Sequence, residues 1–191
     1  MGHDDQEALD FFLSDYRQGL GPHSPLRSAI RDAQAASRGH ALWLATLGYL
    51  VTAEILGRTI ERPDTEFPDR DDDWKVFKAG FLEFADSPAV VAREPLWKLR
   101  CCLAHHFELR KIDRRKRDGE IMSITTFTLD RTGPLWSAPA PPRFTDTVNI
   151  DAVGQYVTDL VDAAQRAHRA GGVSLRRDAQ DVLLGGFVIA P

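Results

Sequence analysis

Residues 99–117, "LRCCLAHHFELRKIDRRKR", place an arginine, two adjacent cysteines, two adjacent histidines and a basic tail in one short stretch. Side chains of these types bind metal ions, attack as nucleophiles, transfer protons or hold phosphate groups. Three kinds of site are therefore open: a zinc site, a cysteine nucleophile with a histidine base, and an arginine–histidine pair that acts on a phosphate.

The zinc interpretation uses helical spacing. Cys101 and His105 are four residues apart, as are Cys102 and His106, so each pair would lie on one face of a helix. A structural zinc site needs four ligands, and no second cluster supplies them, because the other histidines occur singly. Free cysteine also packs as a small apolar side chain, so buried, unreactive cysteines are the simpler interpretation.

Catalysis by one of the two cysteines is the second possibility. A thiol four residues from a histidine on a helix has a base within reach, but no sequence signature of a cysteine enzyme surrounds Cys101 or Cys102.

The third interpretation pairs Arg100 with His105, and here the sequence resembles a known family. "LWKLRCCLAHHFEL" is similar to the motif of the HEPN superfamily, in which an arginine is followed by four to six residues and a histidine near the end of a helix. The apolar stretch "ALWLATLGYLVTAEILG" resembles the helix that packs beside it. The resemblance covers residues 35–112.

This resemblance implies a metal-independent endoribonuclease without a cofactor, in a two-fold dimer with the motif at its interface. A toxin or anti-phage role, with a possible antitoxin partner, is implied in the same way. Active members often carry a polar residue, commonly Asn, after the arginine, whereas this chain has Cys101. That difference favours the alternative, a non-catalytic dimeric HEPN-like binding or scaffold protein.

The residue types suit cleavage of RNA by its own 2′-hydroxyl group. A histidine side chain can accept a proton near neutral pH, so His105 is the candidate base. Arg100 can hold the phosphate with two N–H groups and stabilise the charge of the transition state. Glu54 and His106 are the supporting candidates, and Glu54 has Arg100, His105 or Arg58 as possible partners.

Helix geometry raises an objection to this pair. Five residues turn a straight helix by about 500°, so the side chains of Arg100 and His105 should point about 140° apart. We therefore expect either that the helix ends near Ala104, or that a dimer combines one side chain from each chain. The resemblance favours the dimer.

A basic cluster follows the motif and is the candidate RNA-binding surface. If it lies at a hairpin tip near the site, it would attract the RNA backbone. The alternative is a solvated turn that keeps a sheet edge soluble. Its members are Arg110, Lys111, Arg114, Arg115, Lys116 and Arg117.

The composition agrees with a globular domain that lacks a general affinity for polyanions. The 191 residues include 24 basic and 28 acidic side chains, with a formal net charge of −4 and 43% hydrophobic residues. Any nucleic acid must therefore be bound by a local basic patch. The start lacks a signal-peptide pattern, and the most apolar stretch is too short to span a bilayer, so we expect a cytoplasmic protein that does not bind membranes.

Hydrophobic periodicity predicts a mainly α-helical bundle with a short β-hairpin after the motif helix, and the resemblance implies that this bundle is of HEPN type. We expect residues 1–131 to form the helical domain with the hairpin, 132–148 a proline-rich linker loop, and 149–191 a C-terminal helix and tail packed on the same domain. The predicted helices cover residues 4–18, 26–60 (with Gly39 as the candidate position of a bend), 73–86, 88–104 and 149–170.

Overall fold

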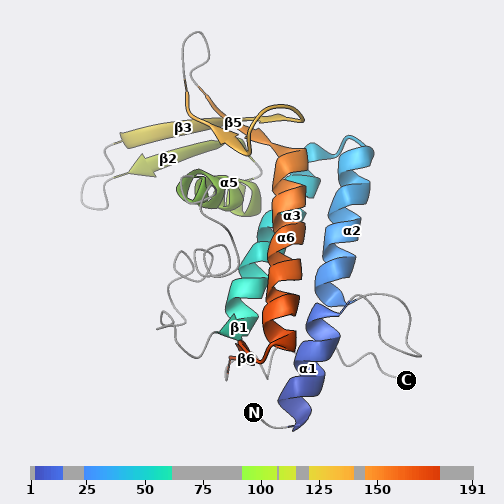
Figure 1. Cartoon of the computed structure of the whole chain (residues 1–191). Coiled ribbons are helices and arrows are strands. Elements are labelled where there is room, and N and C mark those ends of the chain that lie inside the picture. The colour runs from blue at the N-terminus through green and yellow to red at the C-terminus, as the bar shows by residue number, and fades with distance from the viewer. Residues whose placement is uncertain are drawn as a thin grey trace. The chain divides into compact units, whose positions relative to one another are not determined.

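The computed structural model describes residues 3–14, 24–61, 92–106, 108–114, 121–139 and 145–176. Within these ranges the chain forms five helices and two small sheets (Figure 1). The helices are α1 (His3–Leu13), α2 (Pro25–Arg38), α3 (Leu42–Thr59), α5 (Arg93–His106) and α6 (Ile150–Arg169).

The chain divides into two compact units. Unit 1 comprises residues 1–31, 52–86 and 157–191, and unit 2 comprises residues 32–51 and 87–156. The divisions fall within α2, α3 and α6, so each of these helices contributes a part to each unit.

In unit 1, apolar side chains of α1 and polar pairs hold the helices together. Leu9, Phe12 and Leu13 are fully buried. Asp10 accepts a hydrogen bond of 2.8 Å from Nε2 of the buried His168, which links α1 to the end of α6. Strand β1 (Ile60–Glu61) pairs antiparallel with β6 (Ser174–Leu175), and the residues that follow α3 and α6 are thereby joined.

Unit 2 contains a four-stranded sheet in the order β2-β3-β5-β4. Its strands are β2 (Arg110–Arg114), β3 (Ile121–Asp130), β4 (Trp136–Ser137) and β5 (Asp146–Asn149). β2 and β3 form an antiparallel hairpin with a register shift at Asp113/Arg114, β3 and β5 are parallel, and β4 and β5 are antiparallel. Helix α5 lies beneath β2 and β3 (Figure 1), where Phe127 is buried.

The prediction of a mainly α-helical bundle is confirmed in part, because helices predominate among the described residues but the strands exceed the predicted hairpin. The hairpin is confirmed, but residues 132–148, which we expected to be a loop, contain β4 and β5. The fold is therefore a mixed α/β arrangement. β5 pairs in parallel with β3 and ends at Asn149, whose side chain caps α6 by accepting the N–H of Ala152 at 3.1 Å.

The prediction of one long helix over 26–60 is wrong. α2 ends at Arg38 and α3 starts at Leu42. His40 has a positive φ of 61°, and the N–H groups of His40 and Ala41 bond to the carbonyls of Ser37 and Ala36 at 3.0 and 2.9 Å. This is the hydrogen-bond pattern of a Schellman C-cap, with His40 in the position that glycine usually occupies.

The other predicted helices differ from the structure at their ends. The prediction for 149–170 agrees with α6, and that for 4–18 agrees with α1 up to Leu13. The helix predicted at 88–104 begins at Arg93 and continues to His106, with Pro95 in its first turn, where no backbone N–H is required. The helix predicted at 73–86 lies outside the described residues.

Candidate active site

Helix α5, in unit 2, carries both residues of the predicted motif. One of the two expected ways to bring Arg100 and His105 together required this helix to end near Ala104, and it does not. His105 lies in its last turn, and β2 begins at Arg110. Leu96, Leu99, Cys102 and Leu103 are buried and fix the opposite side of the helix in the core.

Arg100 and His105 meet within one chain. Nη1 of Arg100 lies 3.4 Å from Nε2 of His105. The expectation that one regular helix cannot bring them together is therefore wrong. Although the two Cα–Cβ bonds point in different directions, the flexible arginine side chain reaches around the helix to the histidine ring.

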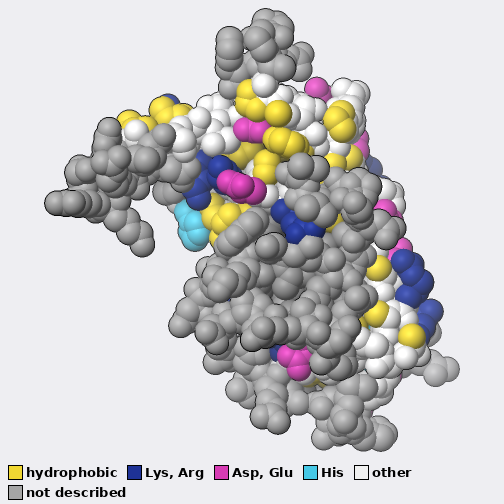
Figure 2. All heavy atoms as spheres, turned by 60° about the vertical axis from the view of Figure 1, so that its left-hand side comes forward, with side chains coloured by type: hydrophobic (Ala, Val, Ile, Leu, Met, Phe, Trp, Pro, Cys, Tyr) yellow, Lys and Arg dark blue, Asp and Glu magenta, His cyan; other side chains and the backbone are white. Residues whose placement is uncertain are grey.

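The direction of this contact matters for chemistry. A guanidinium group only donates hydrogen bonds, so Nε2 of His105 is the acceptor and carries no proton in this arrangement. An unprotonated ring nitrogen is the form of histidine that accepts a proton. His105 is exposed and Arg100 is half-buried. The face of the molecule in Figure 2 shows histidine, basic, acidic and hydrophobic side chains close together at the surface.

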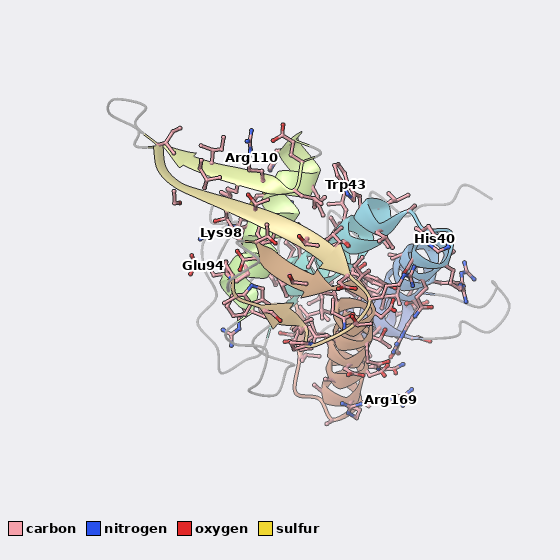
Figure 3. The ribbon with its side chains drawn as sticks, turned by 90° about the horizontal axis from the view of Figure 1, so that it is seen from above. His40, Trp43, Glu94, Lys98, Arg110 and Arg169 are labelled. Carbon is pink, nitrogen blue, oxygen red and sulfur yellow. The ribbon has the colours of Figure 1, made fainter. Side chains whose placement is uncertain are left out.

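Trp97 also holds Arg100, a contact that the sequence analysis missed. The guanidinium carbon of Arg100 lies 5.4 Å from the centre of the Trp97 ring, within the range of a cation–π interaction. Trp97 is three residues before Arg100, the spacing of neighbours on a helix surface, so this signal was present in the sequence. Lys98, the residue after Trp97, forms an ion pair of 2.9 Å with Glu94, which lies one helical turn earlier. Figure 3 labels both residues on α5.

The two supporting candidates have different outcomes. Glu54 belongs to unit 1, where it is buried and accepts hydrogen bonds of 3.0 and 2.9 Å from Nε and Nη2 of Arg58. This contact favours the Arg58 alternative for the partner of Glu54. His106 is the last residue of α5, and its side chain is outside the described set.

The basic cluster begins on β2, in the same unit as the Arg100–His105 pair. Arg110 is exposed and Lys111 half-buried, and the two alternate along the strand, so their side chains point to opposite faces of the sheet. Figure 3 shows Arg110 on β2. The side chain of Arg114 is outside the described set, and Arg115, Lys116 and Arg117 lie outside the described residues altogether.

Neither cysteine forms a disulfide, and Cys101 is half-buried while Cys102 is buried. Among the described side chains, no group of three or more histidine, cysteine, aspartate or glutamate residues is arranged to hold a metal ion. In the same part of the chain, no helix has the length and apolar character needed to cross a membrane.

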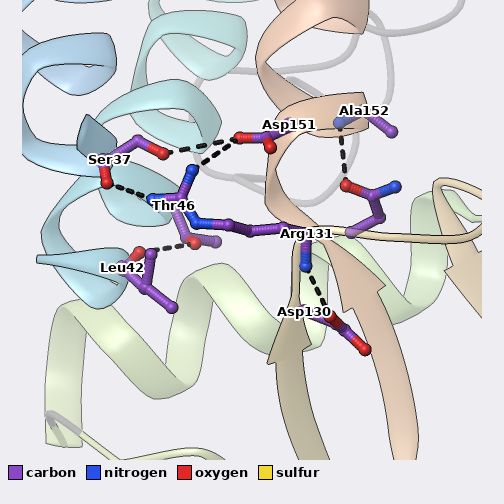
Figure 4. A network of polar contacts seen from close by, with 8 residues as sticks. Ser37, Leu42, Thr46, Asp130, Arg131, Asp151 and Ala152 are labelled. Carbon is purple, nitrogen blue, oxygen red and sulfur yellow. Dashed lines mark hydrogen bonds and ion pairs between the residues drawn. The ribbon is translucent and has the colours of Figure 1, made fainter. Parts of the chain in front are cut away.

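A second polar cluster of unit 2, which the sequence did not reveal, surrounds Arg131 (Figure 4). Arg131 donates to the carbonyl oxygen of Ser37 and, at 3.4 Å, to Asp151. The Ser37 hydroxyl donates to the same carboxylate at 3.5 Å. The cluster ties the end of α2 and the start of α6 to the loop after β3, so its role is structural.

No family model, curated protein or solved structure matches this chain. The function must therefore be argued from the residues themselves.

Proposed function

We propose that this chain is a metal-independent endoribonuclease of HEPN type, with His105 as general base and Arg100 as the phosphate-binding residue. The observation that supports the proposal best is the 3.4 Å separation of Arg100 Nη1 and His105 Nε2 at an exposed position. A base and a phosphate donor this close can act on one phosphodiester group together.

In the proposed reaction, the ribose 2′-oxygen attacks the adjacent phosphorus atom, and its proton passes to Nε2 of His105. The bond from phosphorus to the 5′-oxygen breaks, and that oxygen takes a proton from water. The products are a 2′,3′-cyclic phosphate and a 5′-hydroxyl end. Arg100 donates N–H groups to the non-bridging oxygens, where negative charge increases in the transition state.

For substrate to bind, Arg100 must exchange its contact with His105 for the phosphate. The exchange frees the lone pair of Nε2 for the 2′-hydroxyl. The cation–π contact with Trp97 need not break, because it involves the face of the guanidinium group rather than its N–H edge.

A specific observation favours the alternative, a non-catalytic dimeric scaffold. Two contacts of Arg100, to Trp97 and to His105, are made within its own helix and are compatible with a purely structural role. Cys101, where active HEPN proteins often carry Asn, points in the same direction.

An RNA-cleavage assay in EDTA distinguishes these functions. We expect cleavage by the unaltered protein, and a loss of about 10²–10⁴-fold for His105→Ala. Arg100→Ala should lose a comparable factor, and Arg100→Lys should restore little activity, because lysine keeps the charge but lacks the planar pair of donors. His106→Ala should have much less effect, and His40→Ala, at another exposed histidine of unit 2, is the matched control.

Two outcomes would contradict the proposal. Activity that EDTA abolishes and zinc restores would favour the metal site of Cys101, Cys102, His105 and His106. An absence of cleavage on every RNA tested would favour the scaffold.

We also propose a two-fold dimer with Arg100 and His105 lining the interface groove. Its support is the resemblance alone, since the pair already meets within one chain. Light scattering at micromolar concentration tests it, and a strictly monomeric protein would contradict it. An antitoxin partner and a role as toxin or anti-phage effector remain part of the same proposal.

A further inference from the structure

Arg93, at the start of α5, is a buried cation for which neither alternative above gives a role. It is 7% exposed, and among the described residues its Nε has no hydrogen-bond partner. Burial lowers the pKa of Arg93, and the nearby Tyr156 on α6 partly opposes this effect. Buried cations in proteins are normally paired with an anion, and within the described residues Nε of this guanidinium group still has the capacity to donate to one.

The position of Arg93 on α5 relates it to the candidate active site. Arg93, Trp97 and Arg100 are spaced four and three residues apart, so they follow one another along a single side of the helix. Seven residues correspond to a rise of about 10.5 Å between Arg93 and Arg100. Stacked nucleotides of one strand rise by about 3.4 Å each, so the two arginines are about three nucleotides apart.

Trp97 lies between the two arginines and is half-exposed. Indole rings stack with nucleobases, and this interaction favours single strands, whose bases are not already committed to a double helix. A cation, an aromatic ring and a second cation along one helix side match the alternation of phosphates and bases in such a strand.

We propose that Arg93 binds a second phosphate of the substrate, so that single-stranded RNA runs along α5 with one phosphate at Arg100, a base near Trp97 and another phosphate at Arg93. The Glu94 carboxylate lies beside this path, and its negative charge is paired with Lys98. This inference rests on the proposed ribonuclease function and identifies its substrate as single-stranded RNA.

The test measures binding separately from cleavage. A fluorescent 2′-O-methyl oligonucleotide of about 12 nucleotides lacks the attacking hydroxyl group, so anisotropy reports its affinity without cleavage. We expect Arg93→Met to weaken binding about tenfold, the usual effect of one charge-assisted contact. The slope of log affinity against log salt should fall by about 0.7. Arg169→Met removes the same charge from an exposed position on α6, labelled in Figure 3, and should change neither quantity.

Two further readouts distinguish a phosphate-binding residue from a structural one. With cleavable RNA, Arg93→Met should raise KM and leave kcat nearly unchanged, because the residue does not touch the reacting atoms. The melting temperature should stay equal or rise, since the variant removes a buried charge that has no ion pair within the described part of the chain. A lower melting temperature with unchanged RNA affinity would assign Arg93 to packing against Tyr156 and overturn the inference.

The other outcomes are equally decisive. Cleavage with full affinity in Arg93→Met would refute this inference and leave the proposed function intact. Arg93-dependent binding without any cleavage would refute the proposed function instead. Equal binding of a duplex would remove the single-strand assignment. If inorganic phosphate stabilised the unaltered protein but not Arg93→Met, and the oligonucleotide did not bind, the site would be one for free phosphate and the inference would be wrong.

Discussion

At the scale of single residues, the sequence predicts which chemistry a side chain can perform better than it predicts which residues that side chain contacts. The spacing of Arg100 and His105 was visible in the sequence, whereas their direct contact was not, because helix geometry fixes where a side chain begins and not where a long one ends. Arg131 shows the same limit. Its partners Ser37 and Asp151 are 94 and 20 residues away in sequence, and no local pattern joins them.

Tyr49 provides a test of the electrostatics around this Arg131 cluster. Burial and the negative charge of Asp151 raise the pKa of Tyr49 above its ordinary value of 10.0, while Arg38 and Arg131 partly oppose the shift. A raised pKa in the folded state means that the folded protein holds the phenolic proton more tightly than the unfolded chain. The stability from this effect is complete below pH 10 and is lost as the pH rises through the folded-state pKa of Tyr49.

We therefore predict that Tyr49→Phe flattens the alkaline side of the stability curve. The free energy of unfolding, measured by urea denaturation from pH 8 to about 11.5, should fall with pH more steeply in the unaltered protein than in the variant above pH 10. Parallel curves for Tyr49→Phe and the unaltered protein would contradict the assignment.

At the scale of helices and strands, patterns that repeat within an element were predictable and features set by neighbours were not. The apolar periodicity located α1 and α6, but the two-residue strand β4 and the parallel strand β5 lie in a proline-rich region with no repeating pattern. Their strand conformation depends on pairing with each other and with β3, a long-range contact that local propensity does not encode.

The C-cap of α2 is a local feature whose strain can be measured. We expected a bend at Gly39, yet the left-handed conformation occurs at His40. A residue with a Cβ atom in that region is less stable than glycine by about 1 kcal/mol. His40→Gly should therefore raise the free energy of unfolding by up to that amount, measured by urea denaturation. His40→Ala is the control, because alanine keeps the Cβ atom and should not stabilise the protein.

The crossing of α3 and α6 in unit 2 requires a glycine. A Cβ atom added at Gly154 would lie 2.7 Å from Cζ and 2.8 Å from the hydroxyl oxygen of Tyr49. Since Tyr49 is buried, its ring has little room to move. Gly154→Ala should therefore destabilise the fold by about 1–3 kcal/mol, as overpacked cores do, even though alanine favours helices.

Gly39 provides the matched control for that prediction. A Cβ atom there would meet its nearest neighbour, the carbonyl oxygen of Ala35, at 3.4 Å, an ordinary contact. Gly39→Ala should be neutral or slightly stabilising in the same thermal or urea unfolding measurement. Equal effects of the two substitutions would show that Tyr49 moves aside. The crossing of α3 and α6 would then not require a glycine at position 154.

At the scale of the whole molecule, net charge limits how RNA can be bound. The formal charge of −4 repels a polyanion at long range, so attraction must come from a local concentration of basic residues. The chain supplies one between Arg110 and Arg117, immediately after the helix that carries Arg100 and His105. Arg110 and Lys111 are placed by β2, which packs on α5, so this part of the cluster is held near the candidate active site.

We predict that RNA binding depends on this cluster rather than on total charge. Replacing Arg114, Arg115, Lys116 and Arg117 by glutamine should weaken oligonucleotide binding. Each lost phosphate contact should also reduce the salt slope by about 0.7–0.9.

The control replaces four exposed arginines elsewhere and so removes the same charge. These are Arg31, Arg38, Arg166 and Arg169. If binding were governed by net charge, both variants would lose affinity equally. If the cluster is only a solvated turn, the first variant would keep the affinity and salt slope of the unaltered protein. A loss confined to the first variant would mean that these four basic residues draw the RNA toward α5, where Arg100 and His105 can act on it.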